Sequence, residues 1–190
     1  MGYTARFSRR KFLQITVVAT AAGPVVSCIG TSNPWRCLSE DEARTLAAVV
    51  DRIIPPDQDP GAGWAGVVNF IDRQLVGPYR TFQKPYRLGL AGTNVASLAL
   101  CGKRFTELAG EKQDEVLRAI EKNQAPGTTW KQQPAGQFFE MVLSHTMQGF
   151  YGDPRHGGNR ERASWKMLRL PFPPVRGRLS YDLTTTAVNG

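Results

Sequence analysis

The chain of 190 residues has little of what marks several common classes of protein. It has only three cysteines and no Cys-x-x-Cys-His sequence, so it does not attach a c-type haem by that route. No internal repeat and no long alternating pattern of apolar and polar residues occurs, which disfavours a sheet. The longest apolar stretch, Ile15 to Val26, is interrupted and shorter than the roughly 20 residues of a membrane-spanning helix.

Histidine is also scarce, with His145 and His156 alone in the chain. Neither lies near a serine or cysteine in a recognisable nucleophile motif. With Asp153 they form at most a crude metal-binding set, whereas histidines that serve the structure are commoner. We therefore expect no catalytic residue, no metal site and no cofactor of the chain's own. The alternative is a self-standing periplasmic lipoprotein enzyme or ligand-binding protein that uses this neighbourhood.

The N-terminus carries the most informative motif, the sequence Ser8-Arg9-Arg10-Lys11-Phe12-Leu13. Paired arginines ahead of a moderately apolar run resemble a bacterial twin-arginine export signal, which is recognised by the Tat translocon. Residues 1–27 are therefore predicted to be a cleaved signal peptide. That route carries folded proteins, so the motif predicts a periplasmic, membrane-associated protein.

Two cleavage sites are open. Val25-Val26-Ser27-Cys28 resembles a lipobox, in which Cys28 would carry lipid and residues 28–37 would be an anchored linker. A competing site follows Ala19-Thr20-Ala21. The other two cysteines, Cys37 and Cys101, are a candidate disulfide in an oxidising compartment, although geometry decides such pairing.

Much of the positive charge belongs to the signal. The whole chain has 24 basic and 16 acidic residues, but without the first 27 residues the net charge is +4. No basic stripe or recognised motif accompanies that charge, so the sequence does not predict a nucleic-acid partner.

Residues 38–171 are predicted to form one all-α domain, a compact irregular helical bundle, and residues 172–190 a tail. Ser39 and Glu42 form a capping box at the first helix, and Pro55-Pro56 ends it. A later apolar stripe is predicted to lie in the core, and Asn159 is predicted to cap the last helix. Apolar spacing predicts helices at 39–54, 64–76, 81–100, 111–122, 139–150 and 160–168. The stripe consists of Phe139, Val142, Leu143, Thr146, Met147 and Phe150.

Two further segments carry a family resemblance. The segment Gly149-Phe150-Tyr151-Gly152-Asp153-Pro154-Arg155-His156-Gly157-Gly158-Asn159, followed by Trp165-Lys166, resembles the gluconate 2-dehydrogenase subunit 3 family, as does Asp51-Arg52-Ile53-Ile54-Pro55. The resemblance covers about Leu38 to Pro171. His156 stands where the family usually has tyrosine, and Ser164 where it usually has glycine.

The resemblance implies a small subunit that escorts and stabilises an FAD-binding large dehydrogenase subunit, which passes electrons to a cytochrome c subunit. The glycines of the segment would let another chain approach, and its tryptophan is a typical interface anchor. The alternative is a self-contained turn that only reverses the chain. The predicted partner-facing residues are Phe150, Asp153, Pro154, His156, Gly157, Gly158, Asn159 and Trp165.

Overall fold

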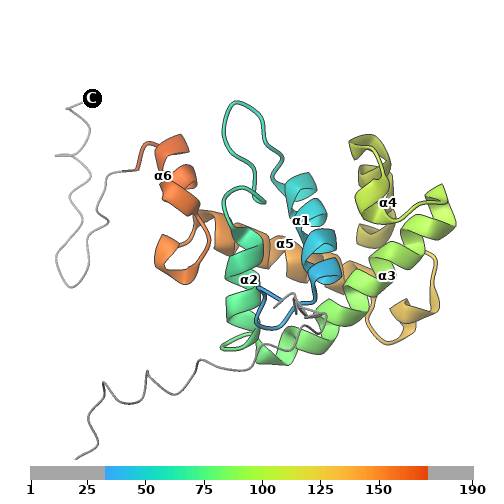
Figure 1. Cartoon of the computed structure of the whole chain (residues 1–190). Coiled ribbons are helices and arrows are strands. Elements are labelled where there is room, and N and C mark those ends of the chain that lie inside the picture. Colours follow the sequence, from blue (N-terminus) through green and yellow to red (C-terminus); the bar gives the residue numbers. More distant parts are fainter. Residues whose placement is uncertain (1–32, 171–190) are drawn as a thin grey trace, which may run out of the picture. The chain divides into compact units, whose positions relative to one another are not determined.

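A computed structural model describes residues 33–170 of the chain. This part is all-α and has no strand, as predicted (Figure 1). The α-helices are α1 (Glu40–Ile53), α2 (Val67–Leu75), α3 (Gln83–Cys101), α4 (Gly110–Glu121), α5 (Ala135–Tyr151) and α6 (Ala163–Met167). The short 3-10 turns are η2 (Arg80–Phe82), η3 (Phe105–Glu107), η4 (Thr128–Lys131), η5 (Pro154–His156) and η6 (Arg160–Arg162). No helix among the described residues is long and apolar enough to cross a membrane.

Helix α5 organises the domain, because it contacts α1, α2, α3, α4 and α6. In Figure 1 it passes behind α1 and α2. Its buried side includes Phe138, Val142 and Phe150, which are part of a core shared by α1 to α5. A single core of this size is expected for a domain of about 140 residues.

Local signals set where the first two α-helices begin. The predicted capping box is present at α1: the Glu42 backbone N–H donates to the Ser39 hydroxyl, and the Ser39 N–H donates to the Glu42 carboxylate. Helix α2 begins at Val67, three residues later than predicted, because Gly66 has a left-handed φ of 80° and Trp64 lies in the preceding turn.

The glycines within α3 allow close helix packing. A Cβ on Gly89 would lie 2.0 Å from the Phe138 ring of α5, and a Cβ on Gly92 would lie 2.7 Å from the Trp130 ring. Large aromatic rings therefore occupy the positions that side chains on α3 would fill. The helix predicted over 81–100 is confirmed, and η2 provides its first turn.

A buried carboxylate fixes the segment that leads into the domain. Asp72, on α2, is only 2% exposed and accepts backbone N–H bonds from Arg36, Cys37 and Leu38 at 2.8, 2.9 and 3.0 Å. A carboxylate with several such donors holds a backbone turn strongly. The sequence analysis did not identify Asp72. Its position, four residues after Val68 and three before Leu75 on the apolar side of α2, was the available signal.

Candidate partner-binding surface

The outer side of α5 exposes a row of large apolar side chains. Leu143, Met147 and Tyr151 follow one another at intervals of four residues, so they lie on one side of the helix. They are 37%, 43% and 37% exposed. The prediction that the whole stripe is core is therefore wrong for Leu143 and Met147. Apolar residues occupy a wider part of the circumference of α5 than its neighbouring helices cover. The covered side includes His145 and Gly149, so it is turned away from Leu143 and Met147.

Two adjoining hollows flank this row. The first has a volume of about 340 Å³ and lies between the end of α1, the loop after it, α5 and α6. The second has a volume of about 350 Å³ and lies between α1, α4 and α5. Ile53 and Leu143 line both hollows, so the two form one continuous surface, which we call the α5 groove. Its apolar lining includes Ile53, Ile54, Pro55, Pro60, Leu117, Phe139, Leu143, Met147, Tyr151 and Met167.

Charged residues surround the apolar centre of the α5 groove. Asp57 and Asp59 lie at the end near α6. At the other end Arg52 donates two hydrogen bonds to Asp114, at 2.7 and 2.8 Å, which ties α1 to α4. The Arg52 guanidinium lowers the pKa of Asp114, so this carboxylate keeps its charge. An apolar centre within a polar rim is the usual anatomy of a protein-binding surface.

The glycine segment, residues 152–159, lies beside the α5 groove and packs against the domain itself. A Cβ on Gly158 would lie 2.1 Å from the carbonyl oxygen of Gly149, so the loop backbone presses directly on α5. Asn159 is fully buried with a left-handed φ of 45°; its amide donates to the Gly152 carbonyl and its oxygen accepts from the Ser164 N–H. Gly157, with a φ of 104°, accepts from the Asn69 side chain of α2.

These contacts correct part of the predicted interface. Gly158 and Asn159 are buried within the domain, so they are not partner-facing, and the chain that approaches the glycines is the domain's own α5. The self-contained turn describes these two residues. Phe150 is also buried, but it lines the first hollow of the α5 groove, so its part in an interface stays a prediction. Asn159 directly precedes η6 without a side-chain bond to it, but its oxygen accepts from the Ser164 N–H in the first turn of α6 and so caps that helix from four residues before its start.

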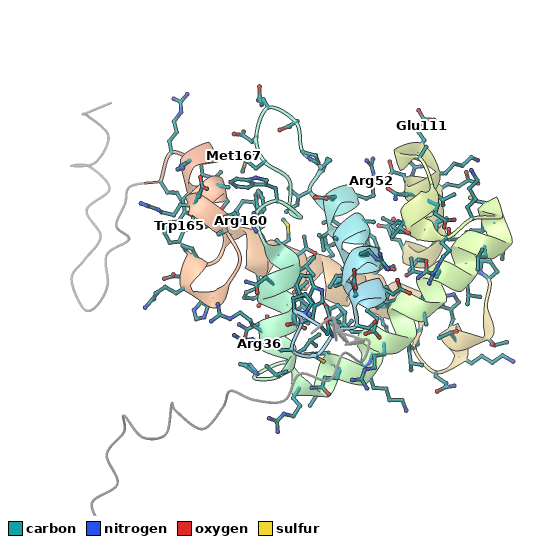
Figure 2. The ribbon with its side chains drawn as sticks, in the orientation of Figure 1. Arg36, Arg52, Glu111, Arg160, Trp165 and Met167 are labelled. Carbon is teal, nitrogen blue, oxygen red and sulfur yellow. The ribbon has the colours of Figure 1, made fainter. Side chains whose placement is uncertain are left out.

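Other members of the predicted interface are accessible. His156 is exposed, and Asp153, Pro154 and Trp165 are half-buried. Asp153 accepts from the Arg155 backbone and guanidinium, which closes the turn before the glycines. The Trp165 indole donates to the Tyr151 carbonyl at 3.0 Å and so joins α6 to the end of α5. Figure 2 labels Trp165 on α6. Their part in an interface stays a prediction.

Ser164, which replaces the glycine usual in the family pattern, is fully buried. Its hydroxyl has no hydrogen-bond partner among the described residues. The departure from the pattern therefore places a polar group in the packed contact between α6 and the glycine segment.

His145 lies on the inner side of α5 and does not meet His156. It is 5% exposed, its Nδ1 lies 3.0 Å from the Tyr86 hydroxyl, and its ring stacks on Tyr79 at 4.1 Å. Burial lowers the pKa of His145 to about 4, so the ring is neutral at pH 7. Within residues 33–170 no group of three or more His, Cys, Asp or Glu residues could hold a metal ion.

Cys37 and Cys101 do not form the candidate disulfide, because both are free thiols. Cys37 lies beside Arg87, near the start of α3, whereas Cys101 ends that helix. The 14 residues between Arg87 and Cys101 span about 21 Å of helix, far beyond the reach of a disulfide. The predicted export residues, Ser8 to Leu13, and the candidate lipidation site Cys28 lie outside the described residues.

Residues 61–66, Gly-Ala-Gly-Trp-Ala-Gly, have the spacing of a dinucleotide-binding motif. They follow α1 and a loop, whereas that motif requires a preceding strand. Packing accounts for two of the glycines: a Cβ would lie 2.7 Å from Pro56 at Gly61 and 2.4 Å from Asp51 at Gly63. The Asp51 carboxylate also accepts from the Gly63 N–H at 2.7 Å, which fixes the loop that borders the α5 groove.

Comparison with protein families gives one match. The family model described as gluconate 2-dehydrogenase subunit 3 matches residues 40–171, which is most of the chain and nearly all of the described domain. No curated protein and no solved structure matches the chain. The matched range contains the α5 groove, the glycine segment and the loop fixed by Asp51.

Proposed function

Because the chain belongs to the gluconate 2-dehydrogenase subunit 3 family, we propose that it is the small, non-catalytic subunit of an FAD-dependent sugar or alcohol dehydrogenase complex. Membership in a subunit family implies partnership with other dehydrogenase subunits. In this proposal the FAD-binding large subunit oxidises the substrate and a cytochrome c subunit accepts the electrons. The small subunit stabilises the large one and takes it through export.

The α5 groove is the observation that carries this proposal. Leu143, Met147 and Tyr151 expose apolar area in one row, and monomeric proteins seldom expose contiguous apolar surfaces without an interaction to cover them. The hollows on either side of Leu143 can accept side chains of a partner. Asp57, Asp59 and the Arg52–Asp114 pair at the rim favour one orientation of that partner.

The paired arginines support the escort role. FAD is loaded in the cytoplasm, so a flavoprotein without its own signal must cross the membrane folded, attached to a partner that carries one. Arg9 and Arg10 supply such a signal in this chain. Membrane association then follows from the other subunits or from lipid on Cys28.

Co-purification tests the docking role. The chain is tagged at its C-terminus and isolated from the native membrane and periplasmic fractions, and the flavin spectrum of any co-purifying large subunit is measured. In the double variant Leu143→Glu/Met147→Glu, two charges occupy the centre of the α5 groove, and we expect the retained flavoprotein to fall at least about 100-fold.

Leu100→Glu is the matched control, because Leu100 is an exposed leucine at 43% on α3, away from the groove. It should retain the flavoprotein at the wild-type level. Equal retention by the groove variant and the wild type would show that the partner binds elsewhere. A colourless wild-type chain that purifies alone would favour the self-standing alternative.

The escort role has its own test. Arg9→Lys/Arg10→Lys keeps the charge of the N-terminus but removes the twin-arginine motif. We expect the flavin-bearing large subunit to remain in the cytoplasmic fraction of cells that carry this variant. Normal export of that subunit in the variant would exclude the escort role while leaving the docking role intact.

A further inference from the structure

Helix α3 presents a second exposed row of side chains, which differs from the α5 groove in charge. Lys84, Arg87, Ala91, Val95 and Leu98 follow one another at intervals of three or four residues and are all exposed. They therefore lie along one side of the helix over about 21 Å. We call this row the α3 stripe. Its first half is basic and its second half is apolar.

Acidic side chains are missing along this part of the chain. Between Asp72 and Glu107 the sequence has six basic residues and no acidic one. Lys84 lies in the first turn of α3, which has no acidic residue, although negative side chains are favoured at that end of a helix. None of the ion pairs among residues 33–170 includes Lys84 or Arg87, so the described part of the fold does not neutralise these two charges.

The segment that precedes the domain extends the basic area. Arg36 is exposed, and its backbone is fixed on α2 by Asp72, whose carboxylate is itself buried and fully engaged. The next residue, Cys37, lies beside Arg87. The chain therefore enters the domain next to the basic half of the α3 stripe, near the position labelled Arg36 in Figure 2.

We propose that the α3 stripe, together with Arg36, is a surface that binds the anionic phospholipid headgroups of a membrane. Lysine and arginine side chains meet the headgroups, and Val95 and Leu98 enter the boundary between headgroups and acyl chains. A membrane offers negative charge at the level of the headgroups and apolar volume directly beneath them, so a row that is first basic and then apolar fits it with the apolar end inserted more deeply.

The position of the N-terminus favours a membrane over an acidic protein as the occupant. Cys28, the candidate lipidation site, is eight residues before Arg36. Eight residues span at most about 29 Å. A lipid attached to Cys28 would thus hold the basic half of the stripe close to a membrane. A polybasic surface is the second signal that makes anchoring by one lipid attachment stable.

Vesicle binding by the full chain tests this inference. Sedimentation is compared between vesicles of phosphatidylcholine alone and vesicles in which about one third of the lipid is phosphatidylglycerol. The wild type should bind the anionic vesicles more tightly, and added salt should weaken that preference. In Arg36→Gln/Lys84→Gln/Arg87→Gln the affinity for anionic vesicles should fall about 100-fold, since each basic residue contributes about fivefold.

The matched control is Arg118→Gln/Lys122→Gln/Lys166→Gln, which removes the same charge from exposed positions on α4, its end and α6. Every variant keeps the same N-terminus, so differences report on the α3 stripe. An equal loss in the two triple variants, or no preference for anionic lipid, would overturn the inference. Retention on an immobilised acidic peptide without vesicle binding would also overturn it and assign the stripe to a protein partner.

Thermal melting checks that each variant is folded. If the stripe triple variant has no melting transition, the single exposed change Lys84→Glu takes its place, with an expected loss of about 25-fold because the charge changes by two units. The inference does not depend on the proposed function. A failure here leaves the flavoprotein retained through the α5 groove, whereas a failure of the groove variants leaves vesicle binding unchanged.

Discussion

The glycine segment and the outer side of α5 adjoin each other but use their residues in opposite ways. The segment buries small and polar groups: Gly158 presses on the Gly149 carbonyl, and Asn159 satisfies two backbone groups from inside the domain. The outer side of α5 leaves large apolar groups exposed, among them Met147. The segment with the more distinctive sequence builds the fold, and the less distinctive one is available to a partner.

This comparison separates two reasons for an unusual residue. A glycine or a left-handed asparagine is required where backbone approaches backbone, and such a requirement acts on stability. An exposed apolar row adds less to the isolated fold than a buried one, so its requirement acts mainly on binding. Variants in the glycine segment should therefore lose stability, whereas variants on the outer side of α5 should lose association with the partner.

The largest expected effect on stability is at Gly158. A Cβ placed there would lie 2.1 Å from a backbone carbonyl oxygen, which cannot move aside as a flexible side chain would. We expect Gly158→Ala to lower the free energy of unfolding by about 3 kcal/mol in urea denaturation. Met147→Ser, on the exposed row, should change it by less than about 0.5 kcal/mol.

Gly102→Ala controls for backbone freedom in this experiment. Gly102 has a φ of 72° with nothing within 4 Å of an added Cβ, so its substitution costs only the left-handed strain, about 1 kcal/mol. A Gly158→Ala variant no less stable than Gly102→Ala would mean that the loop shifts away from α5 without cost, and the contrast between the two regions would fail.

Much of the fold was predictable because its signals are local. The capping box at Ser39, the two prolines after Ile54 and the apolar spacing of the helices depend on neighbouring residues, and the structure confirms them. The family resemblance is confirmed over residues 40–171. These features need no knowledge of which helices meet in space.

The site was less predictable, because burial depends on contacts between distant segments. The spacing of Leu143 and Met147 is identical in a buried and in an exposed helix side, and only the width of the covering neighbours decides between them. Likewise Gly158 indicates a close approach without saying whether the approaching chain is a partner or α5. The role of Asp72 is visible only in the folded structure, in which its carboxylate accepts three backbone N–H groups from a segment distant in sequence.

The second prediction concerns the inner side of α5. The unfolded chain protonates His145 near pH 6.5, whereas burial keeps the folded ring neutral down to about pH 4. The unfolded state therefore binds more protons in this window, so stability should fall as the pH is lowered from 6.5 towards 4 and change no further from this cause below that. The expected total is about 2–3 kcal/mol.

Urea denaturation above pH 5, where few carboxylates titrate, isolates this effect. His145→Gln should be less stable at pH 7, because it loses the stack on Tyr79, but its stability should depend less on pH than that of the wild type. His156→Gln is the control at an exposed histidine and should keep the wild-type slope. If His145→Gln also keeps that slope, the buried ring is not the titrating group.

The smallest expected effect tests whether the rim of the α5 groove belongs to the fold, to the interface or to both. Arg52 and Asp114 are each less than one third exposed and form two hydrogen bonds between α1 and α4. A double-mutant cycle with Arg52→Gln and Asp114→Asn should give a coupling of about 1 kcal/mol. The exposed Lys112–Glu115 pair on α4 should give less than about 0.5 kcal/mol.

Because Arg52 lowers the pKa of Asp114, the coupling should vanish as that carboxylate is protonated at acidic pH. A rim pair that serves the fold alone would leave flavoprotein retention unchanged in both single variants, whereas a pair that also orients the partner would reduce it in each.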